Sequence, residues 1–297
     1  MLARLLRFVI LGQCLTGFGL GYLFFRLGNG PAWCMPLWAA LLPVLTMFLV
    51  DVFTAVKSNA RESAAQWWKS LLGEFWAGIT IFLLRQPWTT QPPSVLAANG
   101  PLARVPVVLV HGYLCNHRIW DDVANDLRAQ GHAVFAVNLE PTFASIDNYV
   151  PIVEAAVSDL CRQTGVNRVA LIGHSMGGLA IRAWMRDCGV QKVARVLTLG
   201  TPHAGTRVEP NAGTPNGLQM RWQSPWLAEL LARENAETRA LIRIALTPQD
   251  NIVFPQRAQV LPGLVPVAFD GIGHLQMCLN PSVRAWILEQ LKDFSAH

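Results

Sequence analysis

Ser175 lies in a sequence pattern that can convert a weak hydroxyl into a nucleophile. The segment Gly173-His174-Ser175-Met176-Gly177 follows a short apolar run at 169–172 and precedes a helical pattern that continues to about residue 187. A sharp turn between a strand and a helix aims the serine hydroxyl away from the sheet, and the flanking positions must be glycine to avoid collision. The same turn places the Met176 amide at a helix N-terminus, where an oxyanion would form.

A serine nucleophile needs an imidazole base, and the imidazole needs a carboxylate that orients it. In a strand–turn–helix setting the three residues follow in the order Ser, Asp or Glu, His. Among the seven histidines, His274 follows a predicted strand and leaves a suitable acid between itself and Ser175. Asp250 follows the preceding predicted strand, whereas Asp270 shares a short loop with His274 that rarely lets a carboxylate reach around the ring. We therefore predict Ser175, Asp250 and His274 as a catalytic triad.

A second oxyanion donor is predicted on an earlier loop. The apolar run 107–110 ends at His111-Gly112-Tyr113. Gly112 lets the backbone turn, so the Tyr113 amide would face Ser175. We predict that His111 forms structural hydrogen bonds and takes no part in catalysis.

These motifs resemble the α/β-hydrolase superfamily and, within it, bacterial lipases and esterases. Besides His111-Gly112 and the segment around Ser175, the matching residues are Gly200-Thr201-Pro202-His203-Ala204-Gly205-Thr206, Gln249-Asp250-Asn251-Ile252-Val253 and Gly271-Ile272-Gly273-His274-Leu275. The resemblance covers roughly residues 105–297. It implies a mostly parallel sheet flanked by helices and oxyanion amides at Tyr113 and Met176. It also implies that the Thr-Pro-His segment helps to shape an acyl pocket.

From residue 105 onward, short apolar runs alternate with helical stretches, which is typical of an α/β domain. We predict strands at 106–110, 133–138, 168–172, 195–199, 242–247 and 264–269, and helices near 118–130, 147–163, 177–187 and 282–294. Residues 205–241 interrupt this alternation with clustered apolar side chains and a short helix capped by Ser224-Pro225. This insertion is interpreted as a cap, whose apolar face either contacts an acyl chain or belongs to the core.

The first 57 residues predict a transmembrane hairpin. Residues 8–25 contain no charge and are just long enough to cross a bilayer. After a Gly- and Pro-rich turn, residues 37–56 form a second apolar stretch of 20 residues, with Asp51 near one end. A cleaved signal peptide is the competing interpretation of the first run, but the residues after it offer a poor cleavage site. The competing interpretation of the pair is a hairpin that dips into one leaflet.

Residues 58–85 carry apolar side chains at helical spacing, with Glu62, Gln66, Lys69, Ser70 and Glu74 on the other side. Six of the eleven tryptophans precede residue 89, and tryptophan favours the membrane interface. We predict an amphipathic helix that lies on the bilayer, with a helix packed on the catalytic domain as the alternative. Residues 86–104 are Pro-rich and are expected to form an extended linker.

Charge and cysteine usage agree with this division. The chain is 52% hydrophobic and only 14% charged, and its net charge of +5 lies entirely before residue 105. This distribution favours a membrane surface, and not nucleic acid, as the partner. Positive residues flank both ends of the hairpin, so the positive-inside rule places the catalytic domain in the cytoplasm, at a bacterial inner membrane. The six cysteines show no metal or redox spacing.

Taken together, the sequence predicts a membrane-anchored serine hydrolase that cleaves carboxylic esters, with a lipid or another acyl ester as substrate. The proposed chemistry requires no metal or organic cofactor. Two alternatives remain open: acyl transfer or amide hydrolysis by the same triad, and a non-catalytic membrane scaffold with the same fold. The acyl-chain length, the head group and the oligomeric state leave no signal in the sequence.

Overall fold

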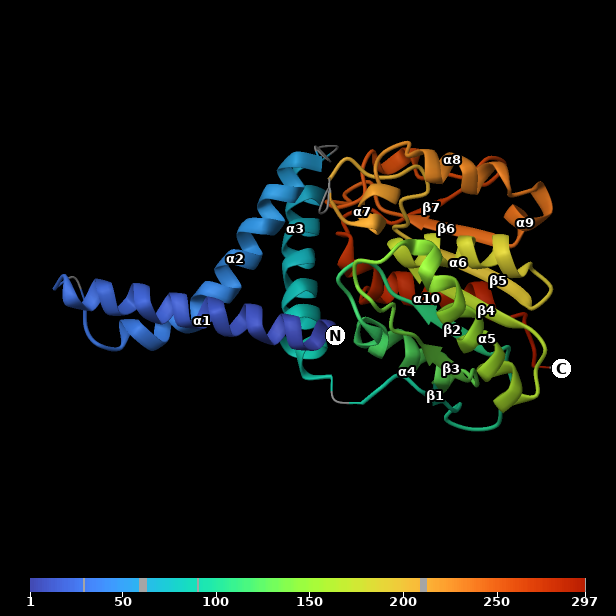
Figure 1. Ribbon diagram of the computed structural model, residues 1–297, viewed down its shortest axis with the longest axis horizontal. Coiled ribbons are helices and arrows are strands. Elements are labelled where there is room, and N and C mark those ends of the chain that lie inside the picture. Colours follow the sequence, from blue (N-terminus) through green and yellow to red (C-terminus); the bar gives the residue numbers. More distant parts are fainter. Residues whose placement is uncertain (29, 59–62, 90, 209–212, 297) are drawn as a thin grey trace.

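The computed structural model describes residues 1–297 except 29, 59–62, 90, 209–212 and 297. Two long helices project from an α/β domain, and a third helix lies between the two parts (Figure 1). The α-helices are α1 Leu2–Arg26, α2 Cys34–Ser58, α3 Ala64–Gly78, α4 Asp121–Ala129, α5 Val150–Thr164, α6 Met176–Cys188, α7 Pro215–Gln219, α8 Pro225–Ala232, α9 Ala236–Ala240 and α10 Pro281–Leu291. The π-helix is η1 Ile79–Arg85, and the 3-10 helices are η2 Gln86–Trp88, η3 His117–Trp120, η4 Ile146–Tyr149, η5 Gln256–Ala258 and η6 Leu275–Cys278.

A seven-stranded sheet in the order β1-β3-β2-β4-β5-β6-β7 forms the centre of the domain. Its strands are β1 Val95–Leu96, β2 Val107–Val110, β3 Val134–Ala136, β4 Val169–His174, β5 Val193–Leu199, β6 Ile242–Leu246 and β7 Val267–Ala268. All neighbours are parallel except β1, which pairs antiparallel with β3. This is the mostly parallel sheet that the sequence predicted. β7 is shorter than the predicted 264–269, because Pro266 has no backbone N–H to give to the sheet.

The strands at the centre of the sheet are buried on both faces, as parallel strands between helix layers must be. Every residue of β2 and β4 is buried. On one face, α5, α6 and Leu227 of α8 pack against the alternate side chains of these strands. On the other face, α4, α10 and Ile81 of η1 form a second cluster. These two layers hold β4 rigidly, and β4 in turn holds Ser175 at its carboxyl end.

Helices α1 and α2 form an antiparallel hairpin whose turn lies far from the sheet (Figure 1). Gly17 and Gly21 allow the close approach: a Cβ on Gly17 would collide with the carbonyl oxygen of Trp38, and one on Gly21 would lie 2.6 Å from that of Cys34. Small residues four apart commonly let membrane helices pack in this way. Both helices are long and apolar enough to cross a membrane, and only 11% and 22% of their most apolar stretches are buried. The hairpin therefore presents apolar side chains outward.

Helix α3 packs one side against the catalytic domain and leaves Trp68, Leu72 and Trp76 exposed. The prediction that Ser70 and Glu74 lie on the water-facing side is wrong, because both are buried. Hydrogen bonds explain the burial: Ser70 donates to the Trp67 carbonyl, and Glu74 accepts amides of the catalytic domain. The periodicity did not separate the two sides as they pack: Leu71 is buried beside Ser70 and Glu74, whereas Lys69 is exposed on the side of Trp68 and Leu72.

The stretch predicted as a linker, residues 86–104, carries regular structure at two places. Gln86, at the start of η2, is fully buried, and its side chain accepts the backbone N–H of Asn116. Strand β1 then adds an antiparallel edge to the sheet through Val95 and Leu96. A two-residue strand is too short to leave a periodic signal in the sequence. Gln86 and strand β1 thus attach this stretch to the domain at two places.

The region predicted as a cap, 205–241, holds α7, α8 and α9. The predicted Ser224 cap is present, since its side chain accepts the Leu227 amide. A buried ion pair fixes the far end of α8: Arg182 of α6 donates to both carboxylate oxygens of Glu234, at 2.6 and 3.0 Å. The indole N–H of Trp226 donates to Asp147. These polar contacts attach the insertion firmly to the domain.

Candidate active site

Ser175 occupies a strained turn between β4 and α6. Its backbone angles are φ 54° and ψ −127°, in the half of conformational space that non-glycine residues rarely adopt. The flanking glycines are required by contact: a Cβ on Gly173 would lie 2.5 Å from the Gly178 nitrogen, and one on Gly177 would collide with the Val110 carbonyl oxygen. The predicted strand–turn–helix setting is therefore present. Buried layers on both sides of the sheet supply the packing that maintains the strain.

Asp250 and His274 are joined by a hydrogen bond of 2.8 Å from Nδ1 of the imidazole to Oδ2 of the carboxylate. Both side chains are buried. The other oxygen of Asp250 accepts the backbone amides of Ile252 and Val253, at 2.9 and 2.7 Å. The carboxylate is thus fixed in orientation and in turn fixes the tautomer that leaves Nε2 of His274 free to accept a proton. Asp270, the competing acid, is exposed.

The electrostatics of His274 suit a base. Burial lowers the pKa of the imidazole, but the charge and hydrogen bond of Asp250, with a contribution from Glu74, outweigh burial and raise the pKa above its ordinary value of 6.5. An imidazolium formed during the reaction would therefore be stabilised in place.

His274 lies next to the turn that carries Ser175. The ring of His174, the residue before the serine, packs against the ring of His274 with centroids 4.6 Å apart. Nε2 of His174 lies 3.1 Å from the His274 carbonyl oxygen. Burial, as the larger cause, and the nearby His274, as the smaller one, hold the pKa of His174 well below its ordinary value. His174 therefore remains neutral and packs against His274. Because His174 directly precedes Ser175, this contact brings the three predicted triad residues to one place.

The loop after β2 lies against Ser175. A Cβ on Gly112 would lie 2.7 Å from Cβ of Ser175, so only glycine permits this approach. Tyr113 follows, with its ring 5.8 Å from that of Phe143. Met176 is the first residue of α6, where helix amides lack intrahelical acceptors. Met176 thus directly follows the serine, and Gly112, the residue before Tyr113, lies against it.

His111 has a structural environment, as the sequence predicted. Its Nδ1 lies 2.8 Å from the Gly112 carbonyl, and its Nε2 accepts the Leu139 amide. This pattern requires the proton on Nδ1. Burial lowers the pKa of His111 to about 4. The neutral ring joins the loops that follow β2 and β3.

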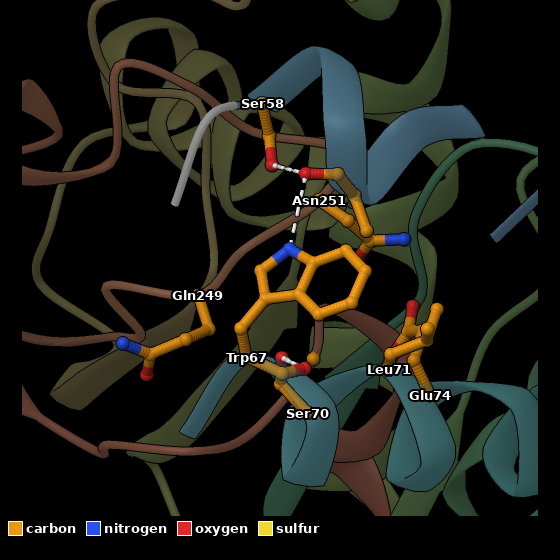
Figure 2. Close-up of a pocket in the computed structure, with 9 residues that line it drawn as sticks. Ser58, Trp67, Ser70, Leu71, Glu74, Gln249 and Asn251 are labelled. Carbon is orange, nitrogen blue, oxygen red and sulfur yellow. Dashed lines mark hydrogen bonds between the residues drawn. The ribbon is translucent and has the colours of Figure 1, made fainter. Parts of the chain in front are cut away.

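Sequence reasoning missed Glu74, the one acidic residue of α3. Its two carboxylate oxygens accept the amides of Leu275 and Gln276, at 2.9 and 3.1 Å, immediately after His274. Figure 2 shows the small polar pocket that Glu74 shares with Gln249 and Asn251, which flank Asp250 in sequence. Burial raises the pKa of Glu74 to about 8, opposed by His274 and by the two amides. The sequence did contain one signal of this role, namely a single acidic residue on a helix that is otherwise mostly apolar.

Among the residues that the structure describes, no group of three or more His, Cys, Asp or Glu residues is arranged to hold a metal ion. His203 lies in the Thr-Pro-His segment but contacts Thr198 and Arg182, at 3.1 and 3.3 Å. It helps to pack the ion pair of Arg182 beneath the cap region.

Comparison with solved structures places the domain in a known fold. The mature form of Bacillus licheniformis lipase BlEst2 superposes with a TM-score of 0.56 at 16% identity, covering 68% of this chain and 98% of the lipase. Aspergillus fumigatus lipase B gives 0.56 at 17% identity, covering 65% and 53%. The chain therefore has the α/β-hydrolase fold of lipases and esterases.

Sequence comparison assigns the chain to a family within this fold. The palmitoyl protein thioesterase family matches residues 106–256, and the chain belongs to that family. A triacylglycerol lipase of Burkholderia plantarii is 36% identical over 124 residues, which are 39% of this chain and 34% of the lipase. A triacylglycerol lipase of Pseudarthrobacter phenanthrenivorans is 38% identical over 112 residues, or 35% and 34%. The similarity spans about a third of the length of these relatives.

Proposed function

We propose that the chain is a membrane-anchored serine hydrolase that cleaves carboxylic esters of acyl groups. The observation that carries the proposal is the Asp250–His274 hydrogen bond of 2.8 Å beside the strained turn of Ser175. An acid that fixes the base and a serine held in a costly conformation are what nucleophilic catalysis requires. The names of the relatives support an acyl substrate.

In the proposed reaction, Oγ of Ser175 attacks the ester carbonyl while Nε2 of His274 takes the hydroxyl proton. The amides of Tyr113 and Met176 stabilise the tetrahedral oxyanion, each by roughly 3 kcal/mol. His274 then protonates the leaving alcohol, and an acyl-enzyme remains on Ser175. Water, activated by the same imidazole, releases the acid. Asp250 keeps its charge throughout and stabilises the imidazolium.

A thioester substrate is a second candidate, favoured by the family description. The same attack on a thioester carbonyl releases a thiol in place of an alcohol. Matched ester and thioester substrates with one acyl chain, given to the full chain in detergent, separate the two. We expect hydrolysis of at least one series and its loss in Ser175→Ala. An enzyme-dependent rate that persists unchanged in the variant contradicts the mechanism.

We further propose that α1 and α2 span the membrane, with both hairpin ends on the cytoplasmic side. The amino group of Met1 lies 2.5 Å from Glu140 of the catalytic domain, and α2 returns to the same domain, which supports a hairpin with both ends on one side. Arg4, Arg7 and Lys57 at these ends favour the cytoplasm. C-terminal reporter fusions test this topology. A signal only from a reporter that is active outside the cytoplasm would contradict it.

A further inference from the structure

A cavity of about 390 Å³ lies between the hairpin and the catalytic domain. Its walls come from α1, α2, the end of α3 and η1, together with Leu114 of the loop after β2 and Leu275 of η6, and most of the lining side chains are apolar. The volume falls within the range of ordinary ligand sites. Because the cavity combines both parts of the molecule, neither the hairpin nor the hydrolase domain would form it alone.

The cavity reaches residues that adjoin the candidate active site. Leu114 lines it and directly follows Tyr113, and Leu275 lines it and directly follows His274. Leu114 has a positive φ of 54°, so the loop turns sharply where its side chain meets the cavity. The lining therefore includes neighbours of both an oxyanion residue and the base.

The same cavity reaches the outer surface of the hairpin. Val9 of α1 and Val50 of α2 line it, and they are 48% and 58% exposed. On a hairpin that spans a membrane, this exposed surface meets acyl chains. Ile10, the next residue of α1, is half-buried in the wall. The cavity thus connects a lipid-facing surface with the loops at Ser175.

One polar group in the wall lacks a partner among the described residues. Asp51 of α2 is 9% exposed, and its Oδ2 has no hydrogen bond there. The other polar pair in the lining is complete, because Gln13 donates to Thr46 at 2.8 Å. An unpartnered buried carboxyl oxygen is costly. A hydroxyl group of a lipid held in the cavity would supply the missing hydrogen bond.

We propose that this cavity binds an acyl chain of a bilayer lipid and guides its ester toward Ser175. The inference rests on the proposed hydrolase function and adds the direction from which the substrate arrives. The competing acyl site is the insertion at 205–241. There Leu227 is packed into the core and Trp226 donates to Asp147, so these two side chains already have partners.

The test uses a long-chain fluorophosphonate with a photoreactive group at the far end of its alkyl chain, reacted with the full chain in lipid vesicles. The phosphonate marks the nucleophile, and irradiation marks whatever surrounds the chain. We expect cross-links to α1, α2 or η1. Cross-links confined to α7 or α8 would overturn the proposal while leaving the hydrolase assignment intact. Failure to label Ser175 at all would instead refute the proposed function and this inference with it.

A matched pair of variants gives an independent readout. Ile10→Trp fills the cavity, whereas Leu11→Trp places the same ring on the exposed side of α1. In Ile10→Trp, kcat/KM for a sixteen-carbon ester should fall by about tenfold or more, while an acetyl ester changes by less than about twofold. Leu11→Trp should leave both rates near the parent values. Equal losses on both esters in Ile10→Trp, or no loss on the long one, would overturn the proposal.

Discussion

Apolar side chains have opposite environments in the two regions of this molecule. The valines and leucines of β2 and β4 are wholly buried between helix layers, whereas Phe8, Leu15 and Phe53 of the hairpin are 71%, 64% and 66% exposed. The difference follows from run length. Four to six apolar residues suffice for a buried strand, while about 20 are needed to cross a bilayer. Composition alone does not distinguish these two regions, whereas the length of each apolar run together with its exposure does.

The two regions also differ in the number of buried polar side chains and in the hydrogen bonds that hold them. In the catalytic domain, Asp250 and Glu234 are buried and held by several donors each. The described residues of the two hairpin helices have few polar side chains, and close backbone packing at glycine holds them together. The predictions below test whether stability and chemistry depend on polar contacts in one region and on packing in the other.

The largest effect on activity is expected from a change at Asp250, the acid that orients His274. Asp250→Asn should lower kcat by about 10⁴-fold, because an amide at this position favours the wrong imidazole tautomer. The control is Asp270→Asn, which changes an exposed acid near His274 and should alter kcat by less than about twofold. Steady-state kinetics on one ester measure both variants. The reverse ranking would show that Asp270 orients the base.

Next in size is the buried ion pair between α6 and the cap region. Glu234→Gln should destabilise the domain by about 3–5 kcal/mol, because Arg182, whose side chain is fully buried, would lose its counter-charge. Glu229→Gln breaks the pair between Arg233 and Glu229, both more than half exposed, and should cost less than about 1 kcal/mol. Thermal unfolding compares the two. Equal shifts in melting temperature would mean that burial does not govern these pairs.

In the hairpin, stability should depend on close packing of the two helices and not on polar contacts. Gly17→Ala should destabilise the contact of α1 with α2 by about 1–3 kcal/mol, since the new methyl meets the Trp38 backbone. Gly19→Ala makes the same change where no atom lies within 4 Å and should be neutral. Proteolysis of the full chain in vesicles measures the opening of the hairpin. Similar cleavage in both variants would argue against a close helix contact.

The last comparison concerns Glu74, where the two regions meet. Its folded-state pKa of about 8 exceeds the ordinary 4.5, so its contribution to stability is full below pH 4.5 and is lost as the pH rises toward 8. The free energy of unfolding should decline over this window by up to about 1.4 kcal/mol per pH unit.

Glu74→Gln should flatten this pH dependence, whereas Glu289→Gln, at an exposed position on α10, should keep it. Denaturant unfolding at several pH values supplies the slopes. An unchanged slope in Glu74→Gln would show that this carboxyl does not cause the pH dependence of stability.

Much of this architecture could be predicted because the relevant signals are local. The turn at Ser175 depends on five consecutive residues, and the order of acid and base along the chain selected Asp250 and His274. Glu74 could not be found in this way, because its partners lie some 200 residues away at Leu275 and Gln276. A contact between distant segments leaves no periodicity. The same reason hid the cavity between the hairpin and the domain, whereas strand β1 was missed because its two residues are too few to show a periodicity.

The most direct test of the central claim is reaction of the full chain with a fluorophosphonate, followed by mapping of the modified residue. Only a serine activated by its neighbours reacts with such a probe at an appreciable rate. The account predicts a single adduct on Ser175, lost in Ser175→Ala while the variant keeps the parent's circular dichroism and melting temperature. An adduct that persists in Ser175→Ala, or a folded parent protein that takes no label, would contradict it.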